Sequence, residues 1–451
     1  MASHLPMSLA LVVAACVLVL THASLDPTTD ALAQKEHVLR THMSTKTMYP
    51  APTASELADD DAQLSHKSNN PYESNHANEC QPIQLNFVVR HGTRFPTIKD
   101  IDRISATHVK LRSLALPERL QQSQWATDDW RNPYDPKRAG WLAGAGVFEQ
   151  ISLGKRLRER FHRRAAGDGS PLQFHADAFV LEHTYKPRTL QSAMGFAFGF
   201  FNGVQPVHYA SEPMGQDHAL RFFANCKAFD RRIEHNATAT AHHKAYQRGR
   251  QMQRNLRAFR RLAGDTSGLL TQKDLEAAYA GCAFDVAVRS EFSEWCALLD
   301  EETLLSMDYY HDLKHFYKKS HGHALAWEIA APLLQDMYHS MRARVDGQSR
   351  VEGHFRFAHA ETILPLASLL NLSYFDRHAS DRDGHFLADT PLECGGQLDD
   401  KPTYRVQTLL HERTVRFPDC GDEPLCPLET FETMFRQWIH EYDYFSQCAL
   451  E

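Results

Sequence analysis

Three short segments of this chain each run from a strand into a turn that carries basic or acidic side chains. They read FVVRHGTR at 87–94, LEHTYKPR at 181–188 and FRFAHAET at 355–362. In open α/β sheets, ligands bind beyond the carboxyl ends of the strands. We therefore expect the three turns to meet at one edge of a sheet and to form one pocket, although they lie far apart in the sequence.

The side chains of these turns point to phosphate chemistry. Arginine guanidinium groups match phosphate oxygens because they offer forked donors. A neutral histidine can attack phosphorus, and a carboxyl group can protonate the leaving oxygen. Fixed cations supply much of the stabilisation in phosphoryl transfer. The set is sufficient for hydrolysis of a phosphate ester without a metal ion, and it consists of Arg90, His91, Arg94, Arg188, His359 and Glu361.

The pattern along the chain predicts an α/β domain that is interrupted once. PIQLNFVV at 82–89 alternates apolar residues as a strand does, whereas 148–164 has apolar residues at helical spacing. Helical patterns dominate residues 209–345. The simplest architecture is an α/β domain made of residues 80–208 and 346–451, with a mostly helical insertion at 209–345.

The N-terminus has the features of a secretory signal peptide at residues 1–23. The apolar run LALVVAACVLVL is followed by THA, a small-residue cleavage pattern, and it is too short for a typical spanning helix. Residues 24–79 are polar and lack apolar periodicity, which predicts a flexible N-terminal segment. We expect a secreted or lumenal protein without a stable membrane span after signal cleavage. The formal charge of −7 argues against nucleic acid as a partner.

Cysteine usage agrees with secretion. One of the nine cysteines, Cys16, lies in the expected signal peptide, and the other eight form an even set, which indicates disulfides in a secreted chain. Sequence alone allows 105 pairings of eight cysteines. Neither CxxC nor HExxH occurs, so we expect no metal site and no cofactor. Asn236-Ala-Thr and Asn371-Leu-Ser are acceptors for N-glycosylation in a eukaryotic secretory pathway.

Longer motifs resemble a known family. RHGTRFPT together with the distant HAE resembles the histidine acid phosphatases, and HAE in place of HD is similar to the multiple inositol polyphosphate phosphatase branch. Further segments resemble that branch in order, among them LGKRLRERF, HTYKPRTLQSAMGFAFGF, DHALRFFANCKAF, CAFDVAVRSEFSEWC and FAHAETILPLASLL. The resemblance covers residues 80–450 and implies an α/β domain with a mostly helical inserted domain. The chain closes with CALE and not with the ER-retention tetrapeptide of some members, which favours export or a lumenal compartment.

The resemblance also implies an activity and roles for the site residues. The substrates would be inositol hexakisphosphate (phytate) and lower inositol polyphosphates, with 2,3-bisphosphoglycerate as a further candidate. His91 would be the nucleophile that forms a phosphohistidine, and Glu361 the proton donor. An extended backbone would point His359 and Glu361 to one side, because they are two residues apart at a strand end. The scissile phosphate would be held by Arg90, Arg94, Arg188 and His359. The implied disulfides are Cys80–Cys394, Cys226–Cys448, Cys282–Cys296 and Cys420–Cys426.

A heavily phosphorylated ring leaves several phosphates outside the scissile site, so basic residues beyond the core should select the substrate. Lys99 follows RFPT directly, and Lys186 precedes Arg188 by two residues, so both are candidate substrate-binding residues. Lys318 and Lys319 of the insertion could reach over from the other wall. For this second pair we favour ordinary solvated lysines.

Two other functions remain open at the level of sequence, as does the oligomeric state. A phosphohistidine can pass its phosphate to a bound alcohol, which would make the protein a phosphomutase or phosphotransferase. The pocket could also belong to a non-catalytic secreted protein that binds anions. An acid such as Glu361 argues against pure binding, and the reaction product distinguishes hydrolysis from transfer.

Overall fold

The computed structural model describes residues 27–49, 51–64, 80–123, 125, 127–165, 176–372, 386–394 and 403–450. The expected signal peptide at 1–23 lies outside these residues. Within the described ranges, no helix is both long and apolar enough to cross a lipid bilayer.

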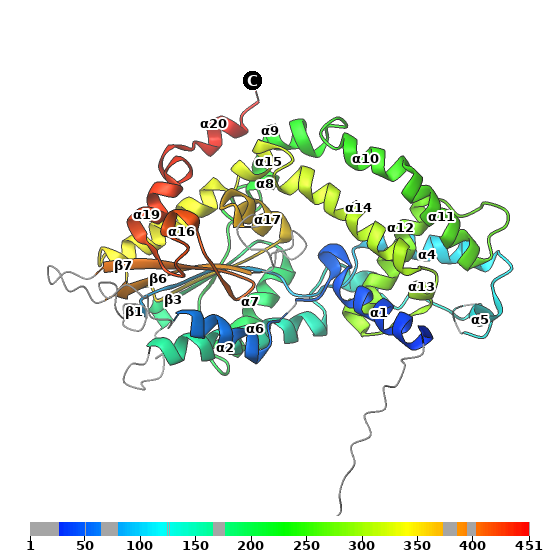
Figure 1. Ribbon diagram of the computed structural model, residues 1–451, viewed down its shortest axis with the longest axis horizontal. Coiled ribbons are helices and arrows are strands. Elements are labelled where there is room, and N and C mark those ends of the chain that lie inside the picture. The colour runs from blue at the N-terminus through cyan, green and yellow to red at the C-terminus, as the bar shows by residue number, and fades with distance from the viewer. Residues whose placement is uncertain are drawn as a thin grey trace, which may run out of the picture.

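A mixed sheet forms the centre of the α/β part (Figure 1). Its strand order is β4-β3-β5-β2-β6-β7-β8, with β1 paired to β6 and β9 paired to β7. β5 (Gly353–Ala358) lies between β2 (Leu85–Arg90) and β3 (Phe179–His183) and is parallel to both, so these three strands end at the same edge. The other described strands are β1 (Cys80–Pro82), β4 (Tyr209–Ala210), β6 (Phe386–Cys394), β7 (Thr403–Leu410), β8 (Arg413–Val415) and β9 (Cys426–Pro427).

Helices cover both faces of this sheet, and every residue of β2 and β5 is buried as a result. α6 (Gly144–Ala165) and α7 (Pro187–Phe200) lie on one face, and α16 (Ala331–Val345), α17 (Ala360–Leu369) and α19 (Leu428–Met434) lie on the other (Figure 1). Phenylalanines fill the layer between the sheet and α6–α7, with Phe196 of α7 packed edge-on against Phe355 of β5. The expected fold class, an α/β domain with a helical part, is confirmed.

The helical part lies beside the sheet and has its own core (Figure 1). It contains α10 (Ala241–Arg248), α11 (Arg250–Ala263), α12 (Gln272–Phe284), α13 (Glu294–Ala297) and α14 (Glu301–Lys319). α4 (Ile98–Arg112), which starts where Thr97 and Asp100 cap each other, packs into the same core through Ile104 and Leu111. α16, by contrast, packs on the sheet although it falls within the expected insertion at 209–345. The helical core therefore draws on residues from both sides of the expected boundary.

Shorter elements connect these layers. They are η1 (Ser44–Lys46), α5 (Glu118–Gln121), η3 (Pro136–Arg138), η4 (Ala176–Ala178), α8 (Phe222–Asn225), α9 (Lys227–Phe229), η5 (Asp230–Glu234), η6 (Asp285–Arg289), α15 (Ala324–Glu328), η7 (Pro418–Cys420), η8 (Gln437–Glu441) and α20 (Tyr444–Cys448).

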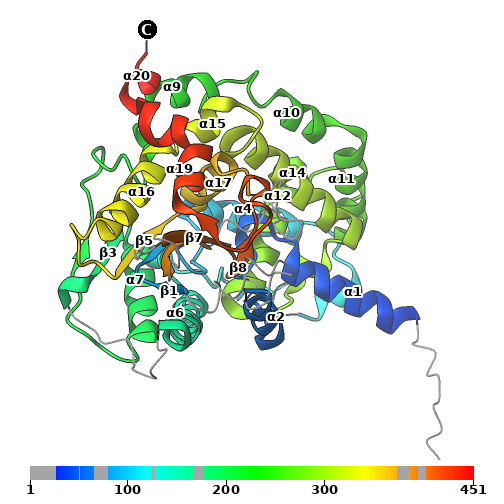
Figure 2. The ribbon, with the colours of Figure 1, turned by 60° about the vertical axis from the view of Figure 1, so that its left-hand side comes forward.

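The N-terminal segment differs from the expected flexible arm at 24–79. It forms α1 (Pro27–Thr41) and α2 (Ala54–Leu64), of which α1 buries Val38 and Leu39 in the helical core. α2 lies beside α6 in both ribbon views (Figures 1 and 2), where the Asp60 carboxylate pairs with Arg160 and accepts from the Thr414 hydroxyl at 2.8 Å. The polar residues of this segment find partners in distant elements, and local periodicity does not report such contacts.

Three of the four expected disulfides are present: Cys226–Cys448, Cys282–Cys296 and Cys420–Cys426. Cys226–Cys448 ties the end of α20 to a loop 222 residues earlier. Cys80 is disulfide-bonded and lies opposite Cys394 in the β1–β6 register. The side chain of Cys394 lies outside the described residues, so the fourth pairing stays a prediction.

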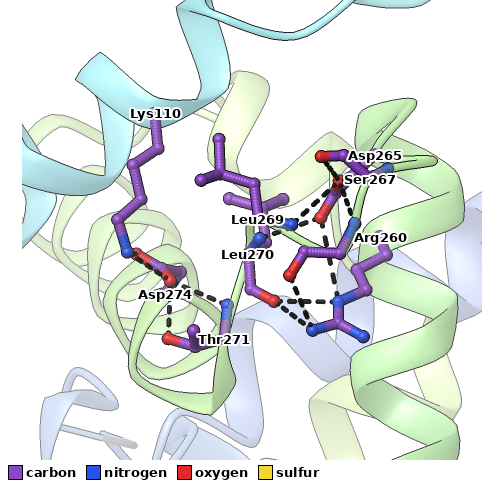
Figure 3. Close-up of polar contacts among 9 residues, drawn as sticks. Lys110, Arg260, Asp265, Ser267, Leu269, Leu270, Thr271 and Asp274 are labelled. Atoms are coloured by element: carbon purple, nitrogen blue, oxygen red, sulfur yellow. Dashed lines mark hydrogen bonds and ion pairs between the residues drawn. The ribbon is translucent and has the colours of Figure 1, made fainter.

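One buried carboxylate organises the loop between α11 and α12 (Figure 3). Asp265 accepts from the backbone N–H groups of Ser267, Gly268, Leu269 and Leu270, at 2.8–3.2 Å. Burial raises the pKa of Asp265, but the hydrogen bonds from Leu270 and Ser267 outweigh it, so the pKa lies below its ordinary value. The loop thus depends on the ionised form of this side chain.

We expect Asp265→Asn to lower the free energy of unfolding at pH 7 by about 1–3 kcal/mol, because an NH2 group, which cannot accept, replaces Oδ2, the acceptor of the buried Leu270 N–H. A lowered pKa means that the wild type holds this contribution above the ordinary pKa and loses it as the pH falls through the folded-state value. The difference in the free energy of unfolding between the wild type and Asp265→Asn should therefore shrink in acid. Denaturant unfolding at pH 7 and in acid measures this difference. Asp300→Asn is the control, since Asp300 accepts one bond, from Thr303 at the start of α14, and asparagine caps a helix equally well. Equal losses for both variants would contradict the prediction.

Candidate active site

The parallel register brings the three expected turns together. Arg90 lies opposite Ala358 in the β2–β5 pair, and His183 lies opposite Phe357 in the β3–β5 pair. The next residues therefore meet at the sheet edge. The rings of His91 and His359 have centroids 5.4 Å apart, and the Thr184 hydroxyl lies 2.9 Å from His359 Nε2. The predicted convergence of distant turns is what the structure shows.

The turn after β2 is held tightly against the start of α6. A Cβ on Gly92 would lie 2.4 Å from the carbonyl oxygen of Gly146, so only glycine allows this approach. Glu149 of α6 accepts from the Thr93 backbone N–H at 2.6 Å and from its hydroxyl at 2.8 Å. Gln150 donates to the carbonyl oxygen of Arg90 at 3.1 Å. The RHGT turn thus has little freedom to move.

His91 is set up as a neutral nucleophile. Its Nδ1 lies 2.9 Å from the carbonyl oxygen of Gly92, which can only accept, so Nδ1 carries the proton and Nε2 keeps its lone pair. Burial, together with the charges of Arg188 and Arg90, holds the pKa of His91 well below its ordinary value. The ring is therefore uncharged near neutral pH, as attack on phosphorus requires.

His359 and Arg188 orient each other. Arg188, in the first turn of α7, donates through Nη2 to His359 Nδ1 at 3.2 Å. Because an arginine can only donate, the neutral His359 ring carries its proton on Nε2, which faces Thr184. Burial and the nearby Arg94 lower the pKa of Arg188 to about 10, so it stays a cation at neutral pH.

Neutral groups contact both arginines of the RHGTR motif. Arg90 donates through Nη2 to the carbonyl oxygen of Thr45, and Arg94 donates to the carbonyl oxygen of Phe95 at 2.8 Å. The Arg94 guanidinium also lies 5.6 Å from the ring centre of Phe284, at the end of α12. These contacts help to place two cations beside the pocket, and their positive charges favour an anion there.

The N-terminal segment supplies a wall of the pocket that the sequence did not reveal. The pocket is lined by Thr45, Lys46, Thr47, Arg90, His91, Gly92, Thr93, Arg94, Phe284 and Ala287. The N–H of Ser44 donates to Asp308 at 2.8 Å, and the hydroxyl of Tyr49 donates to Glu412 at 2.8 Å. Burial lowers the pKa of Lys46 to about 8. In the sequence, the apolar side chains of Met43 and Tyr49, which flank STKT, were the signal that could have indicated an anchored segment.

Arg221 is a second cation that sequence reasoning missed. Its guanidinium lies 4.9 Å from the ring centre of Tyr185 and 5.0 Å from that of Phe223. Its charge adds to the causes that lower the pKa values of Arg188 and His359. Arg221 belongs to the motif DHALRFF. Its distance in the sequence from the three turns gave no indication that it lies beside them.

Glu361 lies at the site, although not on an extended backbone as expected. β5 ends at Ala358 and α17 begins at Ala360, so Glu361 occupies the first turn of a helix. Its carboxylate pairs with Lys319 Nζ at 2.9 Å and stays 43% exposed, so an incoming group can reach it. Burial raises the pKa of Glu361, but Lys319 and His359 outweigh burial and hold the pKa well below its ordinary value.

The four lysines considered from the sequence have different places. Lys319 reaches Glu361 from α14, so the interpretation of Lys319 as a solvated lysine is wrong. Lys318 pairs instead with Glu234 at 2.9 Å. Lys99 is exposed in the first turn of α4, and the Lys186 ammonium lies 4.6 Å from the ring centre of Tyr185.

One group of side chains has the composition of a metal site. Ligand atoms of Glu182, Asp336 and His354 lie within 4.8 Å of one another. Arg356 donates to Asp336 at 2.7 Å and lies 2.7 Å from His354 Nδ1, so a protein cation already occupies the centre of this group. The group is best explained as the ion-pair network of a buried arginine.

Comparison with known proteins agrees with this geometry. Residues 83–391 match the family model of the histidine phosphatase superfamily (branch 2). The human protein multiple inositol polyphosphate phosphatase 1 is 27% identical over 377 residues, which cover 74% of this chain and 75% of the relative. The Gallus gallus protein of the same name is 28% identical over 364 residues, 75% of this chain and 78% of the relative.

Solved structures show the same fold. The phytase from D. castellii superposes with a TM-score of 0.69 at 15% identity, covering 95% of this chain and 91% of its own. The Bifidobacterium longum multiple inositol polyphosphate phosphatase in complex with inositol hexasulfate gives a TM-score of 0.64 at 16% identity, with 87% and 97% covered. The match over most of the chain, together with the RHGTR turn, shows that this protein is a phosphatase of the histidine phosphatase superfamily, branch 2.

Proposed function

We propose that the protein hydrolyses phytate and lower inositol polyphosphates through a covalent phosphohistidine on His91. The observation that carries this proposal is the state of His91. Its Nδ1 faces the carbonyl oxygen of Gly92, and its ring lies among Arg90, Arg94 and Arg188. A neutral nucleophile surrounded by cations suits attack on a phosphate dianion.

The reaction would proceed in two steps. The lone pair of His91 Nε2 forms the N–P bond while the bond between phosphorus and the inositol oxygen breaks. That oxygen leaves with the electron pair and takes a proton from Glu361. Water then attacks the phosphohistidine, Glu361 takes a proton back, and inorganic phosphate leaves with the histidine restored. Arg90, Arg94, Arg188 and His359 would hold the phosphoryl oxygens in both steps. The contact between His359 Nδ1 and Arg188 would also orient that arginine.

The charge around the core favours a substrate with several phosphates. Lys46 lines the pocket, and the charge of Arg221 acts on Arg188. Lys314 acts on Lys46, and Lys319 pairs with Glu361. Burial lowers the pKa of both Lys46 and Lys314. A single phosphate would compensate only part of this charge. The relatives named multiple inositol polyphosphate phosphatase, and the neighbour solved with inositol hexasulfate, support the same substrate class. 2,3-Bisphosphoglycerate, with two phosphates, is a further candidate.

We also propose that the protein works in the secretory pathway or outside the cell. Disulfides persist in oxidising compartments, and three of them lie in the described part of the chain. The acceptor Asn236 is half-exposed in a turn, where its side chain oxygen accepts from the Thr238 hydroxyl at 2.7 Å. Asn371 is half-exposed just after α17, but the third residue of its acceptor sequence lies outside the described residues.

We expect His91→Ala to lower phosphate release from phytate about a thousandfold or more, because the nucleophile is lost. Rapid quenching of the wild type should trap phosphate on His91, read by mass analysis. His235→Ala, at an exposed histidine, should keep full activity. A positional isomer formed without phosphate release would indicate a mutase, and phytate binding without turnover would indicate an anion-binding protein.

We expect Lys46→Met to raise KM for phytate about tenfold at pH 6, because one charge-assisted contact is lost. Its pKa of about 8 means that the lysine is charged below pH 8 and neutral above it. The difference in KM between wild type and variant should therefore close as the pH rises past 8. Lys137→Met, at an exposed lysine in η3, is the matched control. An unchanged KM for Lys46→Met would remove this residue from substrate binding.

A further inference from the structure

An ion pair joins the helical part to the reaction centre. Lys319 is the last residue of α14, and its Nζ lies 2.9 Å from Oε1 of Glu361 in the first turn of α17. The lysine side chain is 14% exposed, whereas the carboxylate is 43% exposed. The lysine is thus largely shielded from solvent, whereas the Glu361 side chain stays accessible to an incoming group.

Among the described residues, the charged and titratable groups with the strongest action on Glu361 are bases. His359 lies on the turn that leads into α17, Arg94 on the RHGTR turn and Arg188 on α7. α14 contributes Lys319 and, one turn or more earlier, Lys314 and His315. Burial holds the pKa of His315 well below its ordinary value, so His315 is neutral, while Lys319 is a cation in direct contact.

This environment conflicts with the role of a proton donor. An acid must carry its proton when the substrate arrives, but Lys319 and His359 keep the pKa of Glu361 well below its ordinary value. In the substrate-free protein the carboxyl group is therefore ionised at any pH near neutrality. Binding of the substrate therefore has to weaken the interactions that stabilise the ionised carboxylate of Glu361.

We propose that Lys319 is a positioning residue that keeps Glu361 ionised until a second phosphate of a polyphosphate substrate takes over the Lys319 ammonium. This inference rests on the proposed function and deepens it. An ammonium has three donors, so a phosphate can bind it beside Glu361 and then compete for it. The negative charge of the substrate and the weaker pairing both favour uptake of a solvent proton by Glu361.

The proton balance of the step follows directly. Glu361 takes one proton from solvent when the polyphosphate binds and gives it to the inositol oxygen as the P–O bond breaks. A monophosphate has no second phosphate for Lys319, so it would meet an ionised carboxylate. The site would therefore distinguish polyphosphates from monophosphates through kcat as well as through binding.

The neighbouring lysine provides a matched control. Lys318 precedes Lys319 on the same helix and has the same charge, but its ammonium pairs with the Glu234 carboxylate at 2.9 Å and with the Glu234 carbonyl oxygen at 3.0 Å. Lys318→Met removes one positive charge from α14 without touching Glu361. Lys319→Arg, by contrast, keeps a cation opposite Glu361 and should preserve the wild-type behaviour.

The test measures kcat/KM against pH for glycerol 2-phosphate, whose alkoxide needs a proton, and for p-nitrophenyl phosphate, whose phenolate does not. We expect Lys319→Met to move the alkaline fall of kcat/KM for glycerol 2-phosphate upward by about one pH unit or more, a tenfold gain on that limb. The profile for p-nitrophenyl phosphate should not move, and neither should either profile in Lys318→Met. With phytate, Lys319→Met should raise KM and leave the alkaline limb of kcat in place.

Two results would overturn the proposal. An unchanged glycerol 2-phosphate profile in Lys319→Met, or equal shifts for the alkyl and aryl esters, would show that Lys319 does not act through Glu361. Equal shifts of the alkaline limb for glycerol 2-phosphate and phytate would show that a second phosphate does not release Glu361. A wild type without activity on phytate would refute the proposed function instead, since the monophosphate profiles test Lys319 separately.

Discussion

The pairing of β5 with β2 on one side and with β3 on the other is the constraint on which the site depends. Since the three strands run in parallel, their last residues lie at one edge, with Arg90 opposite Ala358 and His183 opposite Phe357. Helices cover both faces, so β2 and β5 are buried throughout and polar chemistry concentrates where the strands end. The RHGTR turn, the start of α7 and the start of α17 then face one space.

Several cations lie around that space, where burial disfavours their charged forms. Burial lowers the pKa of Lys46 to about 8 and that of Arg188 to about 10, which means that both charged forms are disfavoured there. Arg90 and Arg94 are positioned by carbonyl oxygens and by the ring of Phe284. These contacts help to orient the two guanidinium groups. A phosphate that enters the pocket would reduce the repulsion among the cations around it.

Parts of the chain outside the sheet decide what else the pocket can do. The segment around Lys46 closes one wall, and it is fixed by contacts of Ser44 with Asp308 in the helical part and of Tyr49 with Glu412 in the sheet part. Lys319 reaches Glu361 from the end of α14. The sheet edge thus supplies the groups that would act on the scissile phosphate, while the helices and the N-terminal segment supply the charges that a larger substrate would meet.

The sequence by itself determined the strand ends and the reactive residue types. Alternation in PIQLNFVV, and turns rich in Arg, His and Glu after three strands, predicted that these turns meet at one sheet edge. The contact of Arg188 with His359 and the closeness of the His91 and His359 rings agree with that prediction, and the roles of the residues stay predictions. Only the tertiary structure gave the tautomer of His91 and the positions of Lys46, Arg221 and Lys319 near the site. It also showed that the N-terminal segment, expected to be flexible, forms the anchored helices α1 and α2. The physical reason is that periodicity reports which face of an element is buried by its own neighbours. A polar side chain that is held by a distant element, as Lys319 is by Glu361, leaves no periodic signal.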